Sequence, residues 1–194
     1  MRQRAFSLVE LLLVVVILMI VLSFTLPAIN SVVRGGSITR AGQMVGDQIA
    51  LARQAAVARN QTVELRLFKL PGEGVDDQAR YRAIQTVAQK EDGSFQPLSR
   101  VLKFEPHTEV SDSAQLSTLV ASPTVKGSAD VAGQTVPYVG FRFRPDGSTD
   151  LSFTASDGWF LTVKDTRPSD DAIPKNFYTI RVDPHTGRTR VFRP

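Results

Sequence analysis

The chain has 194 residues, of which 42% are hydrophobic and 22% charged, and its mean hydropathy is −0.06. This length suffices for one modest domain with an appendage. The sequence contains no cysteine, which excludes disulfides, thiolate nucleophiles and zinc sites with cysteine ligands. The net charge of +4 is too small for a general attraction to nucleic acid, so such a role must rest on a local basic patch.

The first predicted element is an apolar helix near the N-terminus. Leu11 to Leu22 is an uninterrupted apolar run, and residues 6–29 as a helix would extend ~36 Å, enough to cross a bilayer core with some tilt. Arg2 and Arg4 precede the run, and basic residues favour the cytoplasmic side of a membrane. The sequence therefore predicts a single membrane span, with the rest of the chain on the far side.

A single acid, Glu10, lies in this apolar segment. A carboxylate in a membrane helix costs ~2.5–3.5 kcal/mol, so it needs a partner or a function. A secretory signal peptide would have a shorter apolar region and a small-residue cleavage site after it, and neither is found. Two interpretations remain. One is a plain signal anchor. The other is cleavage between Ala5 and Phe6, which would create a new α-amino group one helical turn from Glu10. A neighbouring copy of the chain could offer its own α-amino group to the same carboxylate.

The basic leader, the small residue and "FSLVELLLVVVILMIVLSFTLP" resemble the class III prepilin signal of type IV pilins and type II secretion pseudopilins. The resemblance implies that a prepilin peptidase cuts after Ala5 and methylates the amino group of Phe6. It also implies that Glu10 acts in filament assembly and that Pro27 kinks the helix. The residue before the cut is usually glycine in that family, so Ala5 implies slower processing.

An amphipathic continuation is predicted over residues 30–60, because apolar residues recur at three- and four-residue spacings. Gly35-Gly36 interrupts this pattern, and Ser37 is a plausible N-cap after it. The sequence thus predicts a membrane helix to about Val33, a bend, and a second helix over about 38–59, with the two glycines as a hinge or a tolerated joint. The apolar positions are Ile29, Val32, Val33, Ile38, Ala41, Met44, Val45, Ile49, Ala52 and Ala56.

Beyond Asn60 the periodicity changes to two, which indicates half-buried strands. Residues 105–137 are rich in Ser, Thr, Ala and Gly, and they are predicted to form a long loop. Strands are predicted at about 62–67, 80–89, 100–104, 138–145, 150–155 and 159–163, followed by a terminal hairpin over 177–192.

A helix followed by strands without alternating helices predicts an α+β fold, a long N-terminal helix before an antiparallel β-sheet or sandwich. The predicted divisions are a leader at 1–5, a transmembrane helix at 6–29, its amphipathic continuation at 30–60 and a globular β domain at 61–194. "IALARQAAVARNQTVELRL", "FRFRPDGST" and "TGRTRV" resemble H-type minor pseudopilins and T-type minor pilins (the GspH/FimT-like group), which implies a domain of the pilin type. The whole chain is also similar to the Verru_Chthon cassette protein D group of prepilin-like proteins.

No pattern predicts an enzyme, a cofactor or a metal. His107 and His185 fall on predicted loops without a recognisable catalytic motif. Some major pseudopilins bind calcium through loop carboxylates, and this chain offers Asp146, Asp150 and Asp170-Asp171. The EF-hand order is absent, however, and a turn accounts for Pro145-Asp146-Gly147 without any ion.

The C-terminal tail is a candidate nucleic-acid contact. Arg188 and Arg190 would share one face of the terminal hairpin, where guanidinium groups suit successive phosphates. "GRTR" also resembles the tail through which some T-type minor pilins contact DNA. The alternative is a solvated strand face with Gly187 as the turn residue. The candidate residues are Arg181, Arg188, Arg190 and Arg193.

The resemblances imply a non-enzymatic minor pilin or pseudopilin, anchored in the inner membrane by one span with a periplasmic C-terminal domain, and then assembled into a filament. Its expected partners are the prepilin peptidase, other pilin or pseudopilin subunits and the inner membrane, with DNA as a less favoured partner. A DNA-binding minor pilin of a DNA-uptake filament and a plain signal-anchored envelope protein remain the alternatives.

Overall fold

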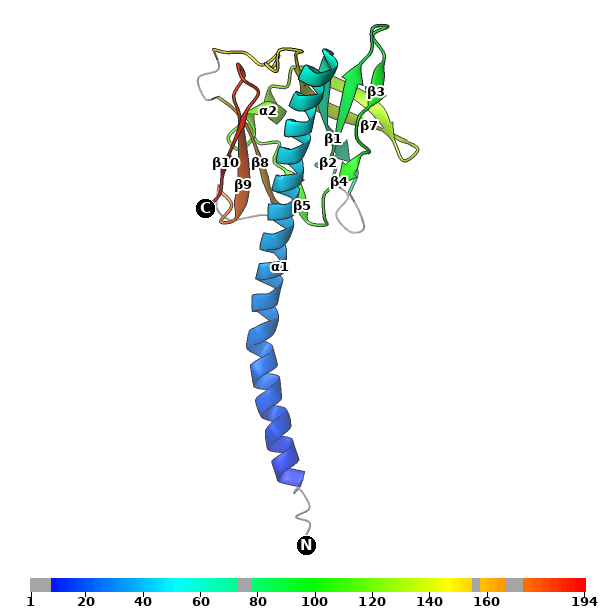
Figure 1. Cartoon of the computed structure of the whole chain (residues 1–194). Helices are drawn as coiled ribbons and strands as arrows, with labels where there is room; N and C mark the ends of the chain where they lie inside the picture. Colours follow the sequence, from blue (N-terminus) through cyan, green and yellow to red (C-terminus); the bar gives the residue numbers. More distant parts are fainter. Residues whose placement is uncertain (1–7, 73–77, 155–157, 167–172) are drawn as a thin grey trace. The chain divides into compact units, whose positions relative to one another are not determined.

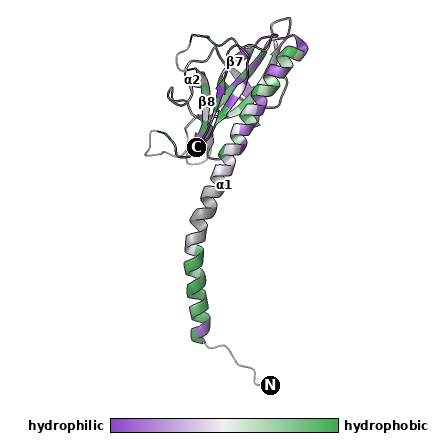
Figure 2. Ribbon diagram, turned by 60° about the vertical axis from the view of Figure 1, so that its left-hand side comes forward, coloured by the Kyte–Doolittle hydropathy of each residue, from purple (hydrophilic) through white to green (hydrophobic). Residues whose placement is uncertain are grey.

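The computed structural model describes residues 8–72, 78–154, 158–166 and 173–194, with the backbone alone for residues 24–34 (Figure 1). The chain divides into two compact units, Met1–Gly36 and Ser37–Pro194. Helix α1 (Leu8–Arg59) begins in the first unit and ends in the second. Its N-terminal turns are coloured as hydrophobic in Figure 2.

The predicted interruption at Gly35-Gly36 is wrong, because α1 is continuous from Leu8 to Arg59. Glycine disfavours a helix by about 1 kcal/mol relative to alanine, a cost that the long flanking helical segments can offset. Ser37, the predicted N-cap, instead donates its hydroxyl to Oε2 of Glu105 at 2.6 Å. The glycine signal is therefore a local preference that the flanking helix overrides, and Ser37 makes a contact distant in sequence instead of an N-cap.

The C-terminal half of α1 packs one apolar face on the sheet, and this face agrees with the predicted positions from Ile38 onward. The helix ends as predicted at Asn60, which takes a left-handed φ of 52° while the N–H of Gln61 donates to the carbonyl of Ala56. The buried hydrophobic residues of this part of the helix are Ile38, Ala41, Val45, Ile49, Ala52 and Ala56.

The described strands form one sheet in the order β10-β9-β8-β5-β2-β1-β7-β6, with β3 and β4 also paired to β2 (Figure 1). Their recorded pairings are antiparallel, which confirms the α+β class. The strands are β1 (Val63–Leu70), β2 (Arg80–Gln89), β3 (Phe95–Pro97), β4 (Leu102–Lys103), β5 (Thr108–Val110), β6 (Val125–Val131), β7 (Gln134–Phe143), β8 (Trp159–Asp165), β9 (Phe177–Val182) and β10 (Thr189–Phe192).

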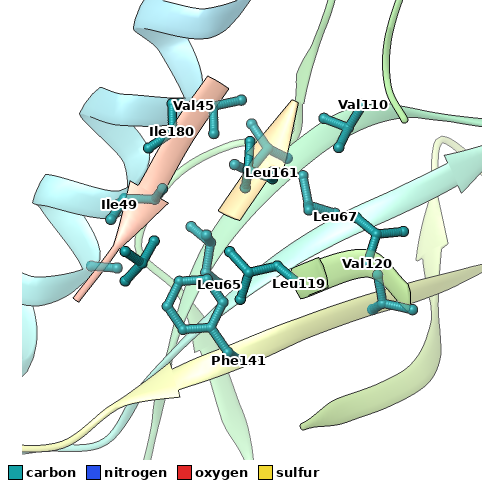
Figure 3. Close-up of a cluster of buried hydrophobic side chains, with 14 of the residues drawn as sticks. Val45, Ile49, Leu65, Leu67, Val110, Leu119, Val120, Phe141, Leu161 and Ile180 are labelled. Carbon is teal, nitrogen blue, oxygen red and sulfur yellow. The ribbon is translucent and has the colours of Figure 1, made fainter. Parts of the chain in front are cut away.

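The main core lies between α1 and the sheet. Val45 and Ile49 of α1 meet alternate residues of the strands, among them Leu65, Leu161 and Ile180 (Figure 3). All five of these side chains are fully buried. Val63, Leu65 and Leu67 belong to the core that includes α1. The prediction of a half-buried strand is nevertheless wrong for β1, because Glu64 and Arg66 between them are buried as well.

The opposite face of β1 carries a buried charge cluster and a second apolar cluster. Glu64 is 1% exposed and accepts from Nε of Arg66 at 2.6 Å and from Nε of Arg142 at 3.0 Å. The guanidinium of Arg66 lies 4.5 Å from the ring centroid of Phe95 and 4.4 Å from that of Tyr138. Both faces of β1 are therefore covered. The second apolar cluster contains Phe68, Leu70, Ala83, Val125, Val131, Val136 and Tyr138.

The long loop predicted at 105–137 is wrong. It contains β5, the short helix α2 (Thr118–Ala121), β6 and the start of β7. β5 has three buried residues in a row, so it shows no alternation. The apolar side of β6 is weak because Gly127 and Ala129 occupy two of its positions.

The strand predicted at 150–155 is also wrong over its described residues. Thr149 makes an isolated bridge with Phe143, after which Asp150 accepts from the N–H of Arg142 and the chain turns away. The carbonyl of Ser152 accepts from Nε1 of Trp159 at 2.7 Å. The alternation of Leu151 and Phe153 suggested a strand whose backbone pairs with a neighbouring strand. Here the carbonyl of Ser152 is instead paired with the indole N–H of Trp159.

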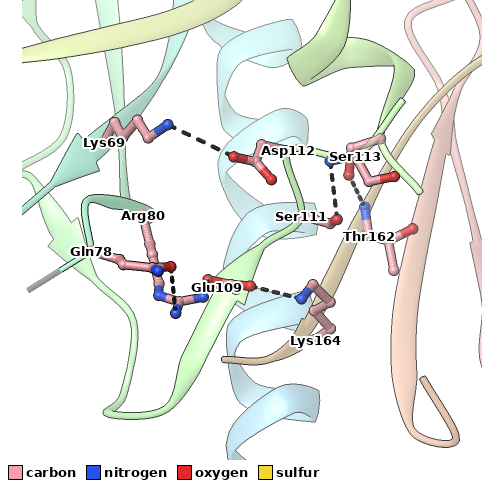
Figure 4. A network of polar contacts seen from close by, with 10 residues as sticks. Lys69, Gln78, Arg80, Glu109, Ser111, Asp112, Ser113, Thr162 and Lys164 are labelled. Atoms are coloured by element: carbon pink, nitrogen blue, oxygen red, sulfur yellow. Dashed lines mark hydrogen bonds and ion pairs between the residues drawn. The ribbon is translucent and has the colours of Figure 1, made fainter. Parts of the chain in front are cut away.

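Polar contacts hold β5 between β2 and β8. Glu109 is 5% exposed, and its two carboxylate oxygens accept from Arg80 at 2.9 Å and Lys164 at 2.8 Å (Figure 4). Beyond β5, the N–H of Ser111 donates to the carbonyl of Thr162, and the hydroxyl of Ser117 accepts from the N–H of Thr162. These bonds satisfy the edge of β8 where β5 has ended.

The turn between β2 and β3 is compact and exposed. Oδ1 of Asp92 accepts from the N–H and the hydroxyl of Ser94, and these bonds lower the pKa of Asp92. Gly93 has a φ of 80°, and a Cβ there would meet nothing within 4 Å. The turn therefore projects away from the rest of the fold.

Among the helical residues that the structure describes, none forms a stretch both long and apolar enough to cross a membrane. The predicted span at 6–29 begins before the described residues, and its side chains beyond Ser23 also lie outside them.

Candidate functional site

Two regions carry the residues that the sequence singles out. The first is the N-terminal part of α1, where large apolar side chains are exposed by 42% (Val15) to 79% (Leu8). Every residue from Leu8 to Leu22 except Glu10 is apolar, so the apolar surface surrounds the helix. Such a helix is suited to lipid or to packing among other helices rather than to water.

Glu10 lies in the first turn of α1. Pro27 lies inside α1, and the helix continues through it. The predicted cleavage pair, Ala5 and Phe6, lies outside the described residues, and so does the side chain of Pro27.

The second region is a surface hollow of about 640 Å³ beside the β9–β10 hairpin, which we call the hairpin hollow. Arg181, Arg188 and Arg190 all contribute to its lining, whereas Arg193 does not. Arg190 is the register partner of Arg181 on the neighbouring strand, so both extend from the same face of the sheet. The other lining residues are Ser152, Phe153, Gly158, Trp159, Val182, Asp183, Pro184, His185, Thr186 and Thr189.

None of these three guanidinium groups makes an ion pair within the part of the chain that the structure describes. Asp183 is the nearby acid, but Oδ1 of its carboxylate accepts from the N–H groups of His185 and Thr186, both at 2.9 Å. The bonds from Thr186 and His185 lower the pKa of Asp183, so this acid stays ionised to shape its own turn. The lining of the hollow therefore carries more positive than negative charge, with three arginines against the one carboxylate of Asp183.

Gly187 of the "GRTR" tail has a structural role. It is buried with a φ of 62°, and a Cβ there would lie 2.4 Å from the carbonyl oxygen of Gly147. Nε of Arg53 on α1 donates to the carbonyl of the preceding Thr186 at 2.7 Å. The hairpin turn is thus packed between α1 and the turn that follows β7.

Phe153, His185 and Gly158 are among the lining residues that the sequence did not single out as contacts. The rings of Phe153 and His185 stack with centroids 4.0 Å apart and an interplanar angle of 10°. Gly158 has a φ of 73°, and a Cβ there would lie 2.9 Å from a terminal guanidinium nitrogen of Arg181. Gly158 was the only one of the three with a local signal, since a glycine can mark an unusual backbone conformation. Phe153 and His185 are far apart in the sequence, and each looks like an ordinary loop residue.

The described residues contain no group of three or more His, Asp or Glu side chains placed to hold a metal ion. Oδ1 of Asp146 accepts from the N–H of Ser148, and Oδ1 of Asp150 accepts from the N–H of Arg142. Asp170 and Asp171 lie outside the described residues. His107 has a left-handed φ of 64° in a loop, and its carbonyl accepts from the N–H of Thr166.

No curated protein matches the chain. Two solved structures of the minor pseudopilin EpsH from the type II secretion system of Vibrio cholerae are similar in fold. One has a TM-score of 0.47 and 11% identity over 81% of this chain and 98% of that one. The other has a TM-score of 0.49 and 11% identity over 82% and 95%, and at these values the likeness says nothing about function. Residues 1–26 match the sequence family described as "Prokaryotic N-terminal methylation motif", so the chain carries the N-terminal motif of prepilin-type proteins.

Proposed function

We propose that this protein is a non-enzymatic minor pilin or pseudopilin, a subunit of a type IV pilus-like or type II secretion filament. The observation that carries the proposal is the methylation motif at residues 1–26. The apolar surface of α1 over residues 8–22, with Glu10 as its one charge, supports it.

The mechanism follows from these parts. A prepilin peptidase removes residues 1–5 and methylates the amino group of Phe6. The apolar part of α1 holds the subunit in the inner membrane with the β domain in the periplasm, and on assembly it packs against the equivalent helices of other subunits. Glu10 then meets the positive N-terminus of a neighbour, which offsets the cost of placing a carboxylate in hydrocarbon.

Co-expression of the full chain with an active prepilin peptidase tests the proposal. Mass spectrometry of the purified product should find an N-terminus at methylated Phe6, whereas an inactivated peptidase should leave Met1. Ala5→Gly should raise the processed fraction, because glycine is the usual residue before the cut. A product that keeps Met1 beside the active enzyme would instead support a plain signal-anchored envelope protein.

DNA binding is a second candidate function, favoured by the three arginines that line the hairpin hollow. Guanidinium groups bind phosphates and release counterions, so binding must weaken as salt rises. A gel shift of the full chain in detergent should lose the complex in Arg188→Ala/Arg190→Ala and keep it in Arg100→Ala/Lys103→Ala, which removes the same charge from an exposed segment. Absent or salt-insensitive binding would rule this function out.

A further inference from the structure

β10 forms one edge of the sheet. Its recorded partner among the described residues is β9 alone, so its other side presents unpaired backbone groups. The carbonyl of Arg188 accepts from the N–H of Asp183 and therefore faces β9. Because direction alternates along a strand, the N–H and C=O groups of Thr189 and Val191 face the open edge.

The side chains of β10 differ from those of β6 at the opposite edge. Val191 is 49% exposed and Phe192 is 51% exposed, so this edge carries apolar surface. The exposed side chains of β6 are Lys126, Ser128 and Asp130, which are polar and of mixed charge. Polar side chains of this kind protect an edge from further pairing, whereas β10 combines open backbone groups with apolar contact area.

The charge at β10 has one sign. Arg188 and Arg190 are exposed beside Arg181, and Asp183 uses Oδ1 of its carboxylate within the turn. A second copy of β10 paired antiparallel would bring the arginines of both copies together, and like charges in cross-strand positions are destabilising. An acidic strand would meet complementary charge instead.

We propose that an extended acidic segment of another protein adds to the sheet at β10. Its backbone pairs with Thr189 and Val191. Its carboxylates lie on the face of Arg188 and Arg190, and its apolar side chains on alternate positions contact Val191. Strand addition supplies affinity through the main chain and specificity through alternate side chains. This inference does not rest on N-terminal processing or on the filament role.

The test uses the full chain in detergent and fluorescent peptides followed by anisotropy. The probe is a seven-residue peptide that alternates Glu and Val. One matched peptide replaces Glu with Lys, and another replaces the central Val with Pro, which removes a main-chain donor without changing the charge. We expect only the uninterrupted acidic peptide to bind, and Arg190→Glu to weaken it by about tenfold or more.

Two further variants separate pairing from general attraction. Val191→Pro removes an outward N–H at the edge, so it should also weaken binding of the acidic peptide. Arg100→Glu makes the same charge change as Arg190→Glu at a distant exposed site, and it should leave that binding unchanged. Circular dichroism melting checks that each variant is folded. Equal binding of the proline-interrupted peptide would overturn strand addition. So would displacement of the acidic peptide by a DNA oligonucleotide at lower concentration, which would assign the surface to nucleic acid.

Discussion

Gly42 faces the ring of Tyr178 where α1 crosses β9. A Cβ at residue 42 would lie 2.3 Å from Cγ and Cδ1 of that ring. Gly42→Ala must therefore displace Tyr178, and the lost packing exceeds the gain of about 1 kcal/mol in helix propensity. We expect the free energy of unfolding in urea to fall by about 1–3 kcal/mol.

Gly46, one turn further along the same helix, is the matched control. A Cβ there would meet nothing within 4 Å, so Gly46→Ala gains propensity without a clash. We expect it to stabilise the fold by up to about 1 kcal/mol. If both substitutions destabilised equally, the contact with Tyr178 would not be the cause.

Glu105 has its pKa lowered to about 2, first by the hydrogen bonds from Arg40 and then by that from Ser37. Nε of Arg40 donates to Oε1 at 2.6 Å, and a terminal guanidinium nitrogen donates to Oε2 at 2.7 Å. A carboxyl whose folded pKa is depressed contributes stability above its unfolded pKa and loses it as the pH falls through the folded one. The contribution of Glu105 should therefore disappear between about pH 4.5 and pH 2.

Urea unfolding across this pH range measures the effect. The wild-type protein should exceed Glu105→Gln in stability at pH 6, and the difference should shrink toward pH 2. Solvent screening keeps the difference modest, because both side chains are substantially exposed. A difference that does not change with pH would exclude ionisation as its source. Glu91→Gln, in the exposed β2–β3 turn, is the control.

At the scale of elements, the β9–β10 hairpin depends on Gly187. Gly187 has a left-handed φ of 62°, and a Cβ at this residue would lie 2.4 Å from the carbonyl oxygen of Gly147. There is therefore no room for a side chain. Gly187→Ala should lower the free energy of unfolding by about 2 kcal/mol or more, because left-handed strain adds to a backbone clash. Gly133→Ala separates the two costs, since Gly133 has a φ of 82° and nothing within 4 Å. It should cost about 1 kcal/mol, and equal melting temperatures for the two variants would refute the packing account.

The elements that the sequence predicts well are those with one buried and one open face. β9 alternates Ile180 and Val182 with exposed Arg181, and this pattern is visible without a structure. β5 is buried throughout, and its three residues are fixed by neighbours far away in the chain. Residues 151 and 153 alternated like a strand, yet Phe153 stacks on His185 and β7 already pairs with β1 and β6.

At the scale of the whole molecule, the N-terminal motif could be predicted because its information is local in the sequence. For the hairpin hollow, the sequence singled out the arginines as candidate contacts but did not predict the hollow itself. Phe153, His185 and Gly158 meet there through tertiary packing, which no local pattern encodes. Gly187, interpreted in the sequence as a turn residue, proved also to be a point of contact with Gly147.

Glu10 links the fold to the proposed filament role. Glu10→Ala removes a charge from an apolar helix, so membrane insertion should be unchanged or improved. Incorporation into filaments should fall, because the carboxylate that we propose to meet a neighbouring N-terminus is lost. Fractionation of membranes and sheared filaments measures both quantities in one culture, with Glu10→Asp as the variant that keeps the charge. Normal incorporation of Glu10→Ala would refute the pairing.

The exposed turn between β2 and β3 has a practical consequence for labelling this protein. A tag after Pro194 would prolong the chain beyond the open strand β10 and could occupy its edge, while a tag before Phe6 would be removed with the leader under the proposed processing. Residues 91–94 project from the fold, and Gly93 has open space around it. A short epitope or a fluorophore attached at this turn keeps the label away from both β10 and the predicted leader.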